Sequence, residues 1–220
     1  MNLGQMRSAV LTRLGEDTVA PIYWSDDDVN EAINDGYEEL SDASEWYERS
    51  ANIPFLSNLR YFDLRTALGD DTFLSPRRAF NPNTNWWLKP SDPRDLDFHT
   101  YRRWEINLGT PQRIIQRGLF YIGIFPLQNG DAGLMKFWYS AMPPALITDA
   151  DEPPFPQEFH QGIIEYALFD LMGQESQTSK ALVHWEQYQK IENDFIQYVN
   201  KRISTDRLDS LHEISVLGRQ

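Results

Sequence analysis

The stretch GLFYIGIFPLQNGDAGLMKFWY, residues 118–139, decides how this chain is organised. Two short runs rich in aromatic and aliphatic residues, 118–126 and 134–139, flank a segment of turn-forming residues, 128–133. This pattern predicts two strands that are joined as a hairpin. Helical periodicity is lost here, so a β-rich part interrupts the helical patterns on either side of it.

The β-rich part extends outward from this stretch over residues 51–144, where Pro, Gly and aromatic residues are frequent. Residues 60–64 and 85–88 predict further strands, while residues 100–108 predict either another strand or an irregular crossing. We interpret the whole part as a small antiparallel β-sandwich or a curved sheet.

Residues 1–50 predict two helices. An apolar stripe at helical spacing marks the first: Leu3, Met6, Val10 and Leu14. Gly15 is placed to end this helix. Ser25 can cap the second helix, and the three aspartates after it suit the positive end of the helix dipole. Within that helix Asn30 and Asn34 are unfavourable residues, which either hydrogen-bond to a neighbouring chain segment or face water.

Residues 145–203 predict two more helices, the first from Pro156 to Gly173 and the second from about residues 176–179. After Ile203 the pattern weakens, yet residues 204–220 keep scattered apolar residues, as a segment that orders on a partner would. The predicted class is α+β. Its predicted parts are a helical bundle (1–50 and 145–203), an inserted β-rich domain (51–144) and a tail (204–220).

The chain is strongly acidic, with a net charge of −13 and a pI near 4.7. No Lys or Arg occurs between Arg13 and Arg49, although twelve Asp and Glu residues do. Such a segment forms a solvated helix face, or a surface that repels nucleic acid or meets a basic partner. Mean hydropathy is −0.54, and no apolar run approaches the roughly 20 residues of a membrane helix. Residues 1–13 mix polar and charged residues among the apolar ones, so we expect no secretory signal.

The sequence lacks the common catalytic templates. It has no cysteine, no phosphate-binding glycine loop and no nucleophile elbow, and its four histidines are far apart. The acidic runs at 26–28 and 149–152 fit a helix start and a solvated linker better than a cation site. A carboxylate pair of the glycosidase kind stays open, because any acidic chain supplies candidates. We predict no enzyme activity, no cofactor and no metal.

Seven tryptophans are a high number for 220 residues. Trp86 and Trp87 are adjacent, so in a strand their side chains point to opposite faces. Either a sandwich uses both faces internally, or one tryptophan is exposed for a subunit interface or for stacking on sugar.

The order of motifs resembles the head-to-tail adaptor (connector) proteins of tailed bacteriophages. The resemblance covers roughly residues 3–200, and it rests on an ordered set of short motifs: 23–26 (YWSD), 60–64 (RYFDL), Trp104, 109–112 (GTPQ), 118–126, 137–139 (FWY), 142–144 (MPP), 149–153 (DADEP), Phe155-Pro156, His160, 166–167 (YA) and Ala181. No motif matches beyond Ile203.

The resemblance implies a structural virion protein at the head–tail junction, assembled in the bacterial host cytoplasm. Such proteins form a ring, typically twelvefold, beneath the portal protein, extend the DNA channel and support a tail, nozzle or stopper protein. DNA passes through without specific binding, and no membrane is involved. The resemblance implies a C-terminal segment that docks on the portal, for which the candidates are Leu208, Leu211, Ile214, Val216 and Leu217. The candidates for a channel-facing acidic helix are Asp27, Glu31, Asp35 and Glu38, and those for a subunit or tail interface are Trp86, Trp87 and Trp104.

Three alternatives remain at this point. The Trp-rich part could belong to a glycan-binding or glycan-cleaving tail component, which requires paired carboxylates in a groove beside an exposed tryptophan. A stopper or tail terminator protein is another virion position, although those proteins are usually smaller. A cytosolic helical regulator would be a compact monomer.

Overall fold

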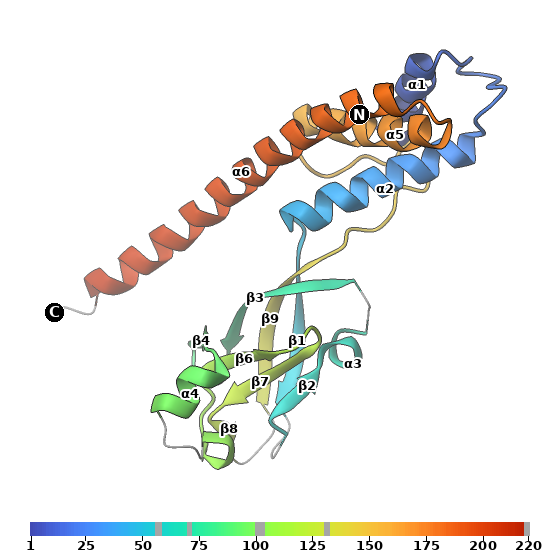
Figure 1. Cartoon of the computed structure of the whole chain (residues 1–220). Helices are drawn as coiled ribbons and strands as arrows, with labels where there is room; N and C mark the ends of the chain where they lie inside the picture. The colour runs from blue at the N-terminus through green and yellow to red at the C-terminus, as the bar shows by residue number, and fades with distance from the viewer. Residues whose placement is uncertain (56–58, 70–71, 100–103, 130–132, 218–220) are drawn as a thin grey trace. The chain divides into compact units, whose positions relative to one another are not determined.

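The structure is a computed structural model that describes residues 1–55, 59–69, 72–99, 104–129 and 133–217, and in these ranges all side chains except those of Phe55, Asp95, Phe98, His99 and residues 203–217. The chain divides into two compact units, which are described separately: the helical unit, Met1–Trp46 with Pro143–Gln220, and the β unit, Tyr47–Met142. The predicted α+β class, with a curved sheet inserted between terminal helices, is confirmed (Figure 1).

Local chemistry sets the ends of the first two helices. Helix α1 (Leu3–Leu14) ends at Gly15, whose φ of 81° is in the left-handed region that glycine adopts without strain. Helix α2 (Asp26–Ser44) begins after Ser25, whose hydroxyl accepts the Asp28 N–H, while the Asp28 carboxylate accepts the Ser25 N–H. Both predicted boundaries are confirmed.

Helix α2 is held closely against the C-terminal part of the chain. A Cβ atom on Gly36 would lie 3.0 Å from the carbonyl oxygen of Ile163, so glycine allows α2 and α5 to approach. Asn34 donates to the Leu146 carbonyl at 3.1 Å and accepts from the Leu146 N–H at 2.8 Å. Of the two roles open for Asn34, hydrogen bonding to a neighbouring segment is the observed one.

Helices α5 (His160–Gln174) and α6 (Thr178–Leu217) complete the helical unit, after a short 3-10 turn, η2 (Gln157–Phe159). The core is formed by apolar residues of α1, α2, α5 and α6, including Met6, Ile33, Leu168 and Tyr188. Helix α6 is much longer than α5, and its C-terminal half extends beyond the packed helices (Figure 1). Most of the segment predicted as a tail, residues 204–217, continues this helix.

The β unit contains one seven-stranded sheet in the order β1-β9-β3-β4-β6-β7-β2. Its pairs are antiparallel except β4–β6, which is parallel. The strands are β1 (Glu48–Phe55), β2 (Tyr61–Asp63), β3 (Phe73–Asn81), β4 (Trp86–Pro90), β6 (Arg113–Arg117), β7 (Tyr121–Phe125) and β9 (Gly133–Ala141). Short elements complete it: α3 (Leu64–Leu68), α4 (Pro93–His99), η1 (Trp104–Ile106) and the parallel pair β5 (Leu108–Gly109) and β8 (Leu127–Gln128).

The predicted hairpin between residues 118–126 and 134–139 is wrong. Strand β7 pairs with β6 and β2, whereas β9 lies between β1 and β3. Strands β6 and β7 are instead joined by a turn at Gly118, whose φ is 68°. The sequence pattern did not predict this turn. Residues 130–132 of the predicted turn, and residues 100–103 of the predicted crossing, lie outside the described part of the chain.

The sheet curls around its own apolar core. Residues from both ends of the sheet, such as Ile53 of β1 and Phe62 of β2, belong to one buried cluster with Phe137 and Ile124. A sheet whose two edges contribute to one core must be curved. The convex face of strands β1, β9, β3 and β4 therefore lies outside this core.

Candidate functional site

Aromatic and cationic side chains share one face of neighbouring strands β9, β3 and β4. Cross-strand partners lie on the same face of a sheet, and the register pairs Trp138 with Arg78, Lys136 with Phe80, and Phe80 with Trp87. The alternate residues of β9, Met135, Phe137 and Tyr139, are buried in the core. We call the set Arg78, Phe80, Trp87, Lys136 and Trp138 the Trp/Arg face.

The Trp/Arg face is a stacked arrangement. The guanidinium carbon of Arg78 lies 5.5 Å from the ring centroid of Trp87 and 4.9 Å from that of Trp138. The two rings are 5.3 Å apart, and the Lys136 ammonium is 4.8 Å from the Trp138 ring. Cation–π contacts of this kind hold both cations over the rings while leaving their charge available. Trp87 is 47% exposed, so the face is accessible.

The predicted interface tryptophans have different environments. Trp86 and Trp87 are both exposed, at 60% and 47%, because the short strand β4 pairs with β3 only through residues 86–88 and then turns to β6. The predicted interface role does not fit Trp104, because only 2% of its surface is exposed. It packs with Ile115 in a small second core, and its indole N–H donates to Asp97 at 2.6 Å.

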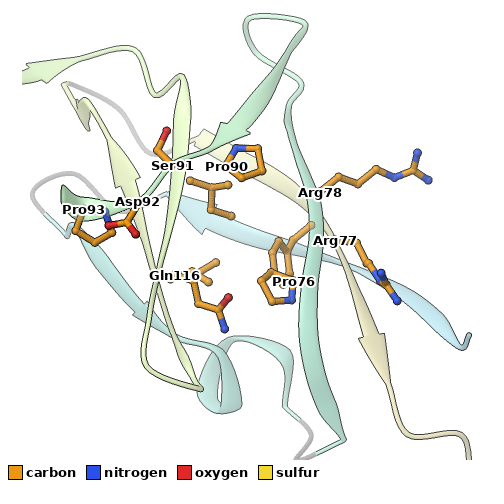
Figure 2. A pocket seen from close by; sticks show the side chains of 11 residues that line it. Pro76, Arg77, Arg78, Pro90, Ser91, Asp92, Pro93 and Gln116 are labelled. Carbon is orange, nitrogen blue, oxygen red and sulfur yellow. The ribbon is translucent and has the colours of Figure 1, made fainter. Parts of the chain in front are cut away.

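A hollow of about 470 Å³ opens where β4 leaves β3 for β6. Its floor is apolar, formed by Ile114, Ile122 and Phe137. Figure 2 shows Arg77 and Arg78 extending from β3 away from Ser91 and Gln116. Asp92 is the only carboxylate among the lining residues, so the paired carboxylates of a glycan-cleaving groove are not found in this hollow.

The predicted acidic helix face is present on α2. Asp27, Glu31, Asp35 and Glu38 are all exposed, and within the described residues none of them has an ion pair. Partial burial and then the nearby Asp170 raise the pKa of Asp35. These residues form a solvated acidic surface.

Next to this surface, carboxylates of α2 and α5 gather around one tyrosine. Burial, followed by the charges of Glu39, Asp170 and Asp35, raises the pKa of Tyr166. We call Asp35, Glu39 and Asp170 the acidic flank. The flank shares Asp35 with the acidic face of α2, and its other two members are Glu39 of α2 and Asp170 of α5.

A buried polar cluster joins three helices of the same unit. The Glu165 carboxylate accepts hydrogen bonds from Arg13 of α1 at 2.7 Å and from Gln161 of α5 at 2.6 Å, and it lies 2.7 Å from Nδ1 of His184 in α6. Burial raises the pKa of Glu165, but these three partners outweigh burial and hold the pKa below its ordinary value. Arg13, Gln161 and His184 all use these contacts to hold the packed helices together, so we interpret the cluster as structural.

Among the described residues, no three histidine, aspartate or glutamate side chains gather as a metal site. His99 and His212 lie outside the described side chains. His160 packs edge-on against Phe155 and bonds the Phe155 carbonyl at 3.0 Å. None of the described helices has a stretch that is both long and apolar enough to cross a membrane.

Residues 1–209 match the family described as SU10 adaptor protein. The chain belongs to this family of phage adaptor proteins. No curated protein matches the chain. As a phage adaptor, the protein is a structural component of the virion, and its family associates with portal and tail components.

The adaptor match ends inside the predicted portal-docking segment. The match includes residues 204–209 of this segment but not residues 210–220, while α6 continues to Leu217. The side chains of the predicted docking residues lie outside the described part: Leu208, Leu211, Ile214, Val216 and Leu217.

Proposed function

We propose that this adaptor forms a ring beneath the portal, twelvefold as the resemblance implies. There it extends the DNA channel and supports the tail, nozzle or stopper protein. The observation that carries this proposal is the adaptor-family match over residues 1–209. The proposed partners are the portal protein, neighbouring copies of the chain and the next tail component, and the place is the head–tail junction.

The acidic face of α2 is the proposed channel wall. Asp27, Glu31, Asp35 and Glu38 are exposed, and no cation within the described residues neutralises them. Proteins hold DNA by Lys and Arg contacts that release phosphate counterions, so a wall of carboxylates offers no such contacts. DNA would therefore pass along this face without specific binding.

The end of α6 is the proposed portal-docking segment. Leu208, Leu211, Ile214 and Leu217 recur at every third position of the sequence, and residues three apart are neighbours on a helix surface. The long α6 extends past α5, so its end is not enclosed by the other helices of the unit (Figure 1). An apolar helix end of this kind suits docking in a groove of a partner.

Cryo-electron microscopy of the native particle tests the ring. We expect density for this subunit in a closed ring between portal and tail, with α2 toward the channel axis. Density only at a distal tail appendage, or no density in the particle, would refute the ring and channel roles.

Removing residues 204–220 should abolish binding to the portal protein and leave the fold intact. The reason is that, among the α6 side chains that the structure describes, the last in the buried core of the helical unit is Val199. Binding is measured by co-sedimentation with purified portal rings, and folding by circular dichroism.

A matched variant replaces Leu208, Leu211, Ile214 and Leu217 with glutamine while keeping the chain length. It should lose portal binding as the truncation does. Full-strength binding by both variants would disprove the docking role.

A further inference from the structure

The two units of the chain carry opposite charge. The β unit, Tyr47–Met142, has twelve Lys and Arg against nine Asp and Glu, a net charge of +3. The remaining residues, in the helical unit, have eight against 24, a net charge of −16. The overall −13 therefore hides a cationic unit and a strongly anionic unit, which can attract each other between copies.

The Trp/Arg face brings two of the cations of the β unit, Arg78 and Lys136, together on one surface. Arg78 meets one carboxylate, Glu48, at 3.2 Å, and both side chains are about half exposed, at 53% and 41%. An exposed pair of this kind is weak and can be exchanged for a better partner. Arginine and tryptophan are the residues that most often dominate protein–protein interfaces. This face thus has the composition of an interface, and among the described residues of the β unit its Trp87 and Arg78 stay about half exposed, at 47% and 53%.

The acidic flank has the complementary chemistry. Helix α2 packs on Tyr166 of α5 at Gly36, where an added Cβ would lie 3.0 Å from the Tyr166 Cβ. Asp35 and Glu39 lie beside Gly36 on α2, and Asp170 follows Tyr166 by one turn of α5. Within the described residues no Lys or Arg forms an ion pair with any of these carboxylates. Like charges held together are mutually destabilising, and a cation from outside would relieve that repulsion. The aromatic ring of Tyr166 adds a surface on which such a cation can rest.

We propose that the Trp/Arg face of one copy binds the acidic flank of a second copy, so that these two different surfaces form the repeating contact of the ring. This inference rests on the proposed ring function. A ring requires a heterologous interface, made by two unlike patches whose rotation closes. The flank shares Asp35 with the acidic face of α2. In this arrangement Glu39 and Asp170 meet the neighbour, while Asp27, Glu31 and Glu38 are left for the channel.

The absence of cysteine from the chain allows a clean crosslinking test. A double variant with Lys136→Cys and Glu39→Cys is assembled on the portal protein of the same virus, checked for rings by negative-stain electron microscopy, and then oxidised. We expect a ladder of disulfide-linked oligomers on a non-reducing gel. Each single variant should give no ladder, because each interface then holds only one thiol.

The matched control pairs Lys136→Cys with Asp194→Cys. Asp194 is exposed on α6 next to Phe195, which packs at the opposite end of α5 from Asp170. Rings without a ladder from the Glu39 pair, or an equal ladder from the control, would overturn the inference and leave the ring function standing. No ring from the unmodified protein on the portal would instead refute the proposed function.

Charge exchange covers the case in which the cysteine variants do not assemble. Arg78→Glu should abolish ring formation, and combining it with Glu39→Arg should restore rings, whereas combining it with Asp194→Arg should not. Unchanged rings in Arg78→Glu would overturn the inference. A further outcome concerns DNA. If the unmodified protein binds a mixed-sequence DNA duplex, and Arg78→Glu loses this binding while its rings stay unchanged, the face is a polyanion site instead.

Discussion

Replacing Glu165 with alanine should lower the free energy of unfolding of the helical unit by about 2–3 kcal/mol, because a buried carboxylate is removed from three partners. Arg13 is 41% exposed and can recover water, which keeps the loss at the lower end of the range for buried ion pairs. Urea unfolding followed by far-ultraviolet circular dichroism measures the change.

The matched control is Glu158→Ala, since Glu158 is an exposed carboxylate just before α5. Its unfolding free energy should change by no more than about 0.5 kcal/mol. Equal losses in both variants would mean that the cluster around Glu165 contributes nothing particular to stability.

The same carboxylate should make stability depend on acidity. Because the folded-state pKa of Glu165 lies below its ordinary value of 4.5, its contribution is complete above that pH. The contribution is lost as the pH falls below 4.5 and through the folded-state pKa, where the folded carboxylate takes up its proton. Glu165→Gln should remove this part of the pH dependence, which unfolding curves at a series of pH values would show.

Helix boundaries could be predicted from the sequence because they depend on neighbouring residues. Ser25 caps α2 through a hydrogen bond three residues away, and Gly15 ends α1 by its own backbone conformation. The role of Asn34 was left open at that stage, because its partner, Leu146, comes from a distant part of the chain.

Strand pairing could not be predicted in the same way. Strand β9, the last strand in the chain, pairs with β1, the first, and this pairing depends on how the curled sheet closes over its core. The local turn at Gly118 competed with the stronger turn signal at 128–133 and was missed.

The candidate site was found only in part for a similar reason. Trp87 and Trp104 are chemically identical, yet one is 47% exposed and the other 2%. Tertiary packing makes this difference. The sequence did not indicate that Arg78, Lys136 and Trp138 lie close together, because their proximity depends on the register of β3 with β9.

Replacing Phe137 with alanine should destabilise the β unit by about 3–5 kcal/mol. Phe137 is completely buried, stacks on Tyr139 at 5.8 Å between ring centroids, and forms part of the floor of the hollow. The hollow can only enlarge when the ring is removed, so little relaxation will offset the loss. Hydrogen exchange with mass spectrometry should show faster exchange in peptides of the β unit than in peptides of α2 and α5.

The neighbouring residue on the same strand provides the control that separates folding from recognition. Trp138 lies on the opposite face of β9, is only partly buried and stacks with Arg78. Trp138→Ala should therefore destabilise the β unit much less than Phe137→Ala, yet weaken ring assembly, because it removes one of the two rings that hold Arg78. If both variants lost stability equally, the Trp/Arg face would be part of the folding core, and its exposed cations would need another explanation. If Trp138→Ala kept both stability and assembly, the stacked rings would not contribute to the contact, and Arg78 and Lys136 would have to account for it by charge alone.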